Sequence, residues 1–227
     1  MIYFSNSIFV HVPKTSGSSF EKMCEQKHGL QKTHGIHSSA IDIEPENRDK
    51  TVFGFMRHPV LSEYSNWRYH KYSWKGTDEF NFSTWCRWRY DTPEKEQAAY
   101  AQSLGLKTKQ IEYGWGFNVN SQAGYFCVED GSCIAKRIFR FEYDTLPESY
   151  AEISKITGKD CSIEGYQAMA YGWGRGKKNY WDDIKDEDVQ ILRRAKTIDF
   201  QLWEKDGKEI KTGFTCQVHT KWDRSRN

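Results

Sequence analysis

A strand that runs into a sharp turn and then a helix is the pattern that most constrains the fold of this chain. Residues 8–12 are an apolar run rich in β-branched side chains, typical of a buried strand, and residues 18–28 have the pattern of a helix. The same order recurs at residues 51–56, which predict a strand, and in a predicted helix from Pro59 to about residue 72. Because strands that alternate with helices build parallel sheets covered on both faces, these segments predict an α/β fold.

The rest of the chain continues this alternation. Residues 138–141 predict a third strand, and further helices are predicted at residues 82–91, 93–104, 147–157 and 186–204. The 227 residues are the length of one domain and no linker interrupts them, so we predict a single domain, residues 1–227, with a central parallel sheet flanked by helices. Ligands of such sheets bind outside the carboxyl ends of the strands, which are the ends that the turns at 13–17 and 57–59 leave.

Charge and hydropathy restrict the classes of partner. The 33 basic and 31 acidic residues leave a net charge of +2 and are spread along the chain, whereas a nucleic-acid binder usually carries a larger or more concentrated basic excess. No apolar run approaches the length of a membrane span, and residues 1–7 lack the features of a signal peptide. We therefore expect a cytoplasmic protein with no nucleic-acid partner and no membrane span, although a luminal domain trimmed of its anchor would have the same pattern. The oligomeric state is left open.

The six cysteines do not have the spacing of a metal site. None belongs to a Cys-x-x-Cys pair and no histidine spacing completes a zinc site, so no metal is expected. Cys127 and Cys133 flank Glu129-Asp130-Gly131, which is typical of a hairpin turn, and would face each other across two strands. A disulfide between them would require an oxidising compartment, and in the cytosol both are expected to be free thiols.

The first turn has the composition of a phosphate-binding loop. At a strand-to-helix turn, backbone N–H groups and the helix N-terminus attract anions, and a lysine adds a full positive charge. Here the lysine comes before the glycine rather than after it, so this is not the loop of the nucleotide triphosphatases. The alternative is a plain strand–helix turn with a surface lysine. The predicted anion-binding residues are Lys14, Thr15, Ser16, Gly17, Ser18 and Ser19.

The second turn supplies another pair of anion-binding side chains. Arg57 stands at the end of the second predicted strand, and Ser65 follows eight residues later in the next predicted helix. An arginine holds a phosphate through two parallel hydrogen bonds, and a serine one or two helical turns further on can face the same group. We therefore predict that Arg57 and Ser65 bind one phosphate together.

The two motifs together resemble those of a known enzyme family. Residues 9–20 are similar to the 5′-phosphosulfate loop of the carbohydrate sulfotransferases, and residues 53–65 are similar to the 3′-phosphate element of the same family. Ser16 stands where the family usually has glycine, and Ser62 stands where it often has a second arginine. Residues 118–122 resemble the family's Asn-x-Gln stretch. In pattern the chain is most similar to the heparan 2-O-sulfotransferases.

The resemblance implies a layout like that of the P-loop nucleotide kinases and an enzyme that uses 3′-phosphoadenosine-5′-phosphosulfate (PAPS) as its cosubstrate. Such an enzyme transfers the sulfuryl group of PAPS to a hydroxyl or amine of an acceptor and releases 3′-phosphoadenosine-5′-phosphate (PAP). A carbohydrate acceptor is expected. The content of 9 Trp, 13 Tyr and 13 Phe also favours a sugar, because aromatic faces pack against sugar rings.

Sulfuryl transfer needs a cation beside the departing phosphate and a base for the acceptor's proton. Lys14 is the predicted cation and would act on the bridging oxygen as PAP leaves. His37 is the predicted base, because its His-Ser-Ser-Ala context resembles the family's His-x-x-Ala, and His34 is the second choice. A carboxylate base is the alternative, for which Glu63, on the predicted helix after Arg57, is the candidate.

Two other functions are compatible with these residues. One is a nucleotide or small-molecule kinase on the same sheet, which the position of the lysine and the lack of an evident magnesium-binding carboxylate disfavour. The other is a non-catalytic relative that binds PAP or a glycan. For the sulfotransferase, the glycine-rich loop with Arg175, Lys177 and Lys178 is expected at the mouth of the cleft, where its charge would steer an anionic partner. The alternative is a solvated basic loop.

Overall fold

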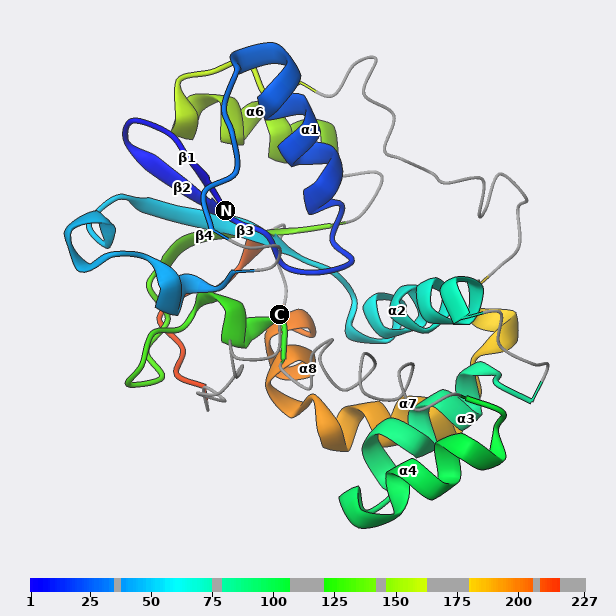
Figure 1. The fold of residues 1–227 in the computed structure, drawn as a ribbon. Coiled ribbons are helices and arrows are strands. Elements are labelled where there is room, and N and C mark those ends of the chain that lie inside the picture. The colour runs from blue at the N-terminus through cyan, green and yellow to red at the C-terminus, as the bar shows by residue number, and fades with distance from the viewer. Residues whose placement is uncertain are drawn as a thin grey trace.

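The computed structural model describes residues 1–34, 38–74, 79–106, 121–141, 146–162, 180–205 and 209–216. Five strands form one sheet in the order β1-β2-β3-β4-β5, with helices above and below it (Figure 1). The strands are β1 (Ile2–Tyr3), β2 (Ser7–Val10), β3 (Thr51–Met56), β4 (Ala135–Arg140) and β5 (Glu209–Ile210). The three strands predicted from the sequence are β2, β3 and β4.

The centre of the sheet is parallel and its edges are not. β2, β3 and β4 run parallel, as predicted, whereas β1 and β5 run antiparallel to their neighbours, so the sheet is mixed. Each edge strand is two residues long, which is too short for a period of two to produce a signal in the sequence. Val10 pairs with Gly54 and Met56 pairs with Arg140, so the chain leaves all three parallel strands at the same edge of the sheet.

One face of the sheet is covered by α1 (Gly17–His28) and α6 (Leu146–Thr157) (Figure 1). Buried aromatic rings join the layers: the ring centroid of Phe9 on β2 lies 4.4 Å from that of Phe20 on α1. Phe55 on β3 lies 5.7 Å from Tyr150 on α6. Ring pairs at these separations stabilise beyond the area they bury, so α1 is firmly fixed directly after the first loop.

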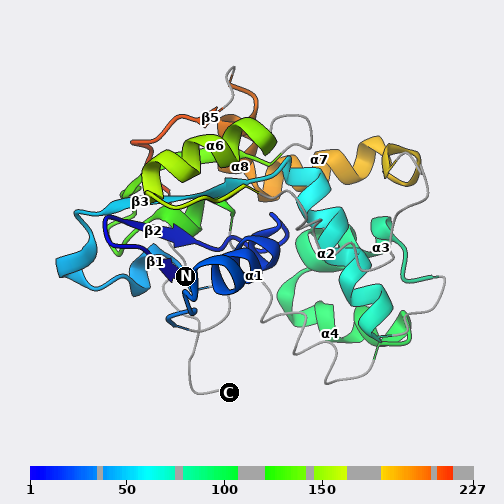
Figure 2. The same cartoon turned by 90° about the horizontal axis from the view of Figure 1, so that it is seen from above.

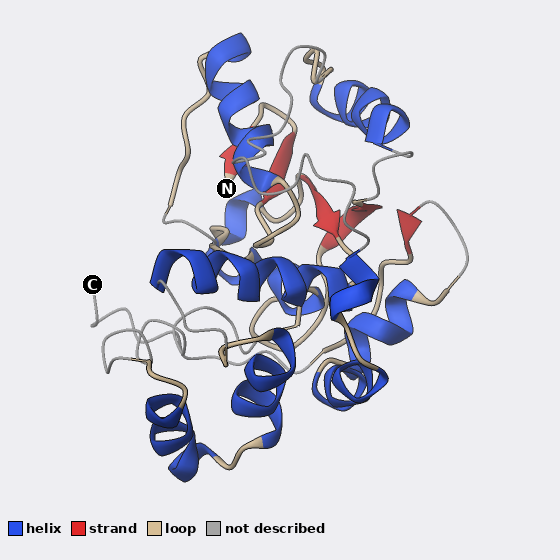
Figure 3. Ribbon diagram, turned by 90° about the vertical axis from the view of Figure 1, so that its right-hand side faces the viewer, coloured by secondary structure: helices blue, strands red, loops and turns tan. Residues whose placement is uncertain are grey.

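The opposite face packs against α8 (Thr197–Trp203) and the short 3-10 turn η4 (Ala123–Phe126). Ile8 and Val10 flank Phe9 on β2 and belong to this second core together with Leu202 of α8, as the alternation of side chains along a strand requires. Figure 3 shows the strands lying between helices on either side. The predicted α/β architecture, with helices on both faces of the sheet, is therefore confirmed. Two further 3-10 turns, η1 (Ala40–Asp42) and η2 (Pro45–Asn47), precede β3.

A third apolar core lies beyond the end of β3 and is formed mainly by helices. Trp85 and Trp88 are buried in it, with their ring centroids 5.4 Å apart. The predicted helix at 82–91 is an α-helix that continues into the π-helical turn η3 (Arg87–Asp91). The helices of this core are α2 (Pro59–Trp74), α3 (Phe82–Cys86), α4 (Glu94–Ser103) and α7 (Asp186–Ala195), and Phe200 of α8 joins them. Figure 2 shows α2, α3, α4 and α7 to one side of the sheet.

The single helix predicted at 186–204 is wrong, because the segment forms two helices, α7 and α8, which meet at Lys196. The backbone of Lys196 has φ −123° and ψ 40°, which is not helical. α7 contributes Leu192 to the core between the helices, whereas α8 contributes Phe200 to that core and Leu202 and Trp203 to the core on the sheet. The break at Lys196 lets one amphipathic segment serve both cores.

Among the helices that the structure describes, none combines the length and the apolar character needed to cross a membrane.

Candidate anion-binding site

The first predicted loop is a strained turn between β2 and α1. Lys14 has φ 65° and Ser16 has φ 61°, so two residues other than glycine adopt the left-handed conformation within three positions. Such residues cost about 1–3 kcal/mol each and are concentrated at functional sites. The Thr15 hydroxyl is buried and donates a hydrogen bond of 2.8 Å to the carbonyl oxygen of Val12, which closes the turn. The strain and the position before a 12-residue helix both fit a loop built to hold an anion.

Gly17 is required at the start of α1 because the His11 ring fills the space beside it. A Cβ atom at position 17 would lie 1.9 Å from Cδ2 of His11. His11 Nδ1 lies 3.0 Å from Glu21 Oε1, and Glu21 Oε2 lies 3.1 Å from the exposed Lys32 ammonium. Burial alone would raise the pKa of Glu21, but the His11 and Lys32 contacts outweigh it and lower that pKa to about 2. His11, paired with Glu21, therefore packs against the start of α1 and holds the loop in place, which is a structural role.

Lys14 points from the loop towards α2. Its ammonium lies 4.2 Å from the centre of the Tyr69 ring, a cation–π contact. Burial, followed by the positive charge of Arg57, lowers the pKa of Lys14 to about 8, although the negative charge of Glu63 opposes the shift. Because β2 and β3 pair in parallel, with Val10 opposite Gly54, the two predicted anion-binding segments leave the sheet at the same edge. A bound anion would offset the repulsion between them.

Arg57 directly follows β3, and its backbone is clamped by one side chain. The Gln122 amide accepts a hydrogen bond of 2.9 Å from Arg57 N–H and donates one of 2.8 Å to the Arg57 carbonyl oxygen. Gln122 is itself fixed by the buried Asp199 carboxylate, which accepts from the backbone N–H groups of Gln122 and Ala123 at 2.9 and 3.0 Å. The Arg57 guanidinium carbon lies 5.8 Å from the centre of the Phe141 ring. These contacts fix the point from which the arginine side chain extends.

Ser65 lies on the half-exposed side of α2. Tyr69 follows it by four residues, so the two side chains are neighbours on one face of the helix. That face meets Lys14 through Tyr69. The structure thus gathers Lys14, Arg57 and the Ser65 face of α2 at the carboxyl edge of the sheet. Tyr69 was not among the predicted site residues, although its spacing from Ser65 could have indicated it.

Of the two histidines predicted as bases, only His34 lies within the described residues. His34 Nε2 lies 3.1 Å from Glu44 Oε1, and its ring stacks on Tyr3 of β1 with the ring centroids 5.8 Å apart. The Tyr3 hydroxyl donates to the other oxygen of Glu44 at 2.8 Å. These contacts hold His34 against an edge strand of the sheet. His37 lies outside the described residues, as do Arg175, Lys177 and Lys178.

Glu63, the alternative base, is enclosed in a buried ion cluster. Trp85 Nε1 donates to Glu63 Oε1 at 2.7 Å, and the same oxygen lies 3.8 Å from Arg89 Nε. The other oxygen lies 3.5 Å from the Lys196 ammonium. Burial would raise the pKa of Glu63, but Lys196 and Arg89 outweigh it and lower that pKa. With 3 % of its surface exposed, Glu63 has the environment of a structural anion rather than of a base that meets an acceptor.

His58, which follows Arg57, and its neighbour Trp181 were not predicted as part of the site. His58 contacts Trp181 edge-on, with ring centroids 5.3 Å apart, and Trp181 is 45 % exposed. Burial, followed by the charges of Arg193 and Arg57, lowers the pKa of His58 to about 4, so its ring is neutral at pH 7. An exposed indole against the residue that follows Arg57 offers a flat surface to a ligand. Nothing in the local pattern around Trp181 indicates this contact, because it joins residues more than 120 positions apart.

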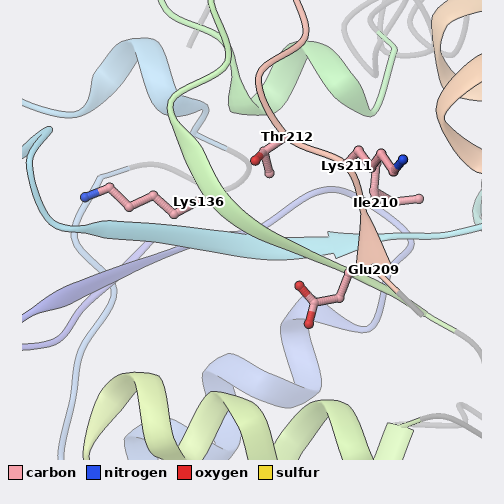
Figure 4. Close-up of a pocket in the computed structure, with 5 residues that line it drawn as sticks. All are labelled: Lys136, Glu209, Ile210, Lys211 and Thr212. Carbon is pink, nitrogen blue, oxygen red and sulfur yellow. The ribbon is translucent and has the colours of Figure 1, made fainter. Parts of the chain in front are cut away.

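A separate hollow lies at the opposite edge of the sheet, beside β5 (Figure 4). Lys136 stands near the start of β4, whereas Lys14 and Arg57 follow the ends of β2 and β3. Lys136 donates to the carbonyl oxygen of Asp49 at 2.7 Å, and Glu209 is paired with Arg137. These polar groups bond to residues in or beside the sheet. Because the hollow lies at the other end of the parallel strands from Lys14 and Arg57, it is distinct from the candidate site. Its lining residues are Lys136, Glu209, Ile210, Lys211 and Thr212.

Comparisons with models of protein families, with curated proteins and with solved structures find no match to this chain. The fold and the site by themselves define an α/β protein with two cationic side chains, Lys14 and Arg57, at the carboxyl edge of its sheet.

Proposed function

We propose that this protein is a PAPS-dependent sulfotransferase, laid out like the P-loop nucleotide kinases, that sulfates a hydroxyl or amine of a carbohydrate. The observation that carries the proposal is the convergence of Lys14 and Arg57 from adjacent parallel strands. PAP carries phosphate groups at both its 3′ and 5′ positions, and two separate cationic elements suit such a ligand. The strained turn of residues 14–16 suits the 5′ end, and Arg57 with Ser65 suits the 3′-phosphate.

In the proposed reaction the acceptor oxygen or nitrogen attacks sulfur in line with the bond to the bridging oxygen. That bond breaks, PAP leaves with the electron pair, and the acceptor's proton passes to a base, for which His37 is the proposed residue. Lys14, whose pKa of about 8 keeps it mostly protonated at pH 7, stabilises the negative charge that develops on the bridging oxygen. The exposed Trp181 beside His58 provides a surface for a sugar ring or for adenine.

Melting temperatures measured with PAP, and with ATP plus magnesium, test the cosubstrate. A ligand that binds only the folded state raises the melting temperature, so PAP is expected to give a large shift and ATP a small one. Radiolabelled PAPS with a panel of glycans then tests transfer. Equal shifts with PAP and ATP, or a larger one with ATP, would contradict the proposal and favour a kinase. A PAP shift with no transfer to any glycan would favour the non-catalytic relative.

His37→Ala is expected to separate binding from chemistry. The PAP-induced shift should remain, while turnover falls about 100-fold or more, as is usual when a positioned acid–base group is lost. His34→Ala is the matched control, because His34 lies in the same segment but is paired with Glu44. Retention of turnover in the His37 variant and its loss in the His34 variant would transfer the role to His34.

A further inference from the structure

Three cysteines, two from one hairpin and one from a distant part of the sequence, meet at one point beside the sheet. Cys127 and Cys133 are paired across an antiparallel bridge, as the hairpin motif predicted. Cys216, 83 positions beyond Cys133 in the sequence, also reaches this point, and its Sγ lies 2.7 Å from Sγ of Cys127. Cys127 is buried and the other two thiols are partly exposed. The sequence pattern predicted the first pair but gave no indication of the third thiol.

The backbone fixes this arrangement. Cys216 N–H donates to the carbonyl oxygen of Gly131 at 3.0 Å, and Cys133 N–H donates to that of Phe214 at 3.1 Å. An antiparallel bridge joins Ser132 to Thr215. Segment 214–216 is therefore hydrogen-bonded alongside the hairpin through an isolated β-bridge. Gly131, at φ 83°, permits the close approach, because a Cβ there would lie 2.5 Å from the Cys216 carbonyl oxygen.

We propose that Cys127 and Cys216 are a disulfide-forming pair, which locks segment 214–216 onto the hairpin when a thiol–disulfide oxidant such as glutathione disulfide is present. Cys133 is then the third thiol of the cluster and stays reduced. This differs from the Cys127–Cys133 pairing that the hairpin motif alone suggests. Both sulfurs of the proposed pair are already in contact, so the bond requires little movement of the backbone.

The oxidation proceeds by two thiol exchanges. The Cys216 thiolate attacks one sulfur of glutathione disulfide, which releases one glutathione thiolate and leaves a mixed disulfide on Cys216. The Cys127 thiolate then attacks Sγ of Cys216 and releases the second glutathione, so two protein thiols are oxidised and one glutathione disulfide is reduced to two thiols. The order fits the exposure of the two groups. The contacts with Cys133 and Cys216 raise the pKa of Cys127, and the contact with Cys127 lowers the pKa of both Cys216 and Cys133. The choice of Cys216 therefore rests on its 2.7 Å contact with Cys127.

The pair lies on a segment that leads directly to the anion-binding site. The Cys127 thiol contacts the carbonyl oxygen of Ala123 at 3.5 Å, and Ala123 N–H is bound by Asp199. Gln122, which clamps the backbone of Arg57, is the preceding residue. The disulfide would thus anchor the Cys127 end of segment 122–127, five residues after Gln122, without using any residue of the site.

Peptide mapping of the full chain tests the pairing. The reduced protein is equilibrated with glutathione disulfide, remaining thiols are alkylated, and the protein is digested under non-reducing conditions. Trypsin alone leaves Cys127 and Cys133 in one peptide, so a second cleavage after Glu129 is needed to separate them. The expected product joins the Cys127 peptide to the Cys216 peptide, with Cys133 alkylated. A dominant Cys127–Cys133 link, six free thiols, or glutathione adducts alone would each overturn the proposal.

Variants distinguish the pair from the neighbouring thiol. Cys133→Ser is expected to keep the cross-link and Cys216→Ser to lose it, and loss in the Cys133 variant would also overturn the proposal. Cys24 and Cys86 are internal controls, because both are buried and burial raises their pKa values. Under the same conditions neither should form a disulfide or a glutathione adduct.

Discussion

Replacing Glu63 with glutamine is expected to lower the free energy of unfolding by about 3–5 kcal/mol, because the substitution leaves the buried cations of Lys196 and Arg89 without their anion. Glutamine has nearly the same shape, so the loss would come from charge rather than from a cavity. For a chain of this size, a loss of about 3–5 kcal/mol corresponds to a fall in melting temperature of roughly 6–20 °C. Urea denaturation followed by circular dichroism measures the change.

Glu204→Gln is the matched control for this variant. Glu204 pairs with Arg193 at 2.6 Å, but both side chains are exposed, and surface pairs contribute only about 0–1 kcal/mol. The comparison also decides what Glu63 does. If Glu63→Gln is as stable as the Glu204 variant and instead loses turnover, Glu63 is a catalytic carboxylate and the structural assignment is wrong.

Replacing Arg57 with alanine is expected to weaken PAP binding about 10²–10⁴-fold. An arginine that binds a phosphate through two charge-assisted hydrogen bonds loses about 1.5–3 kcal/mol for each when it is removed. The fold should be retained, because the contacts with Gln122 use only the main-chain N–H and carbonyl oxygen of Arg57, which alanine keeps. Isothermal titration with PAP, together with the unfolding curve without ligand, separates the two effects.

Arg87→Ala is the control for Arg57, because Arg87 is exposed and pairs with Glu187 away from the site. PAP binding should be unchanged in this variant. An Arg57→Ala protein that binds PAP as tightly as the parent would contradict the assignment of the 3′-phosphate element. An unfolded Arg57→Ala protein would show that the arginine is structural.

The sequence by itself determined the parts of the fold that depend on neighbouring residues. The strand at β2, the turn with Lys14 and the helix after it were predicted because apolar period, turn residues and helix pattern follow one another within 20 positions. The same holds for β3 and Arg57, and for the hairpin between Cys127 and Cys133. Assignment of a sulfotransferase function rests on the resemblance of these local motifs and stays a prediction.

Only the tertiary structure decided which distant groups meet. The apolar spacing of residues 186–204 is continuous and does not indicate the break at Lys196, where the Thr197 hydroxyl donates to the carbonyl oxygens of Arg193 and Arg194. Side chains on the two sides of the break reach different cores. The pairing of Glu63 with Lys196 and the clamp of Gln122 on Arg57 join positions 133 and 65 residues apart. Cys216 likewise contacts Cys127 because an isolated β-bridge between Ser132 and Thr215 holds its segment beside the hairpin. Contacts of this kind depend on how the elements pack, and the periodic pattern of side chains along the chain does not predict them.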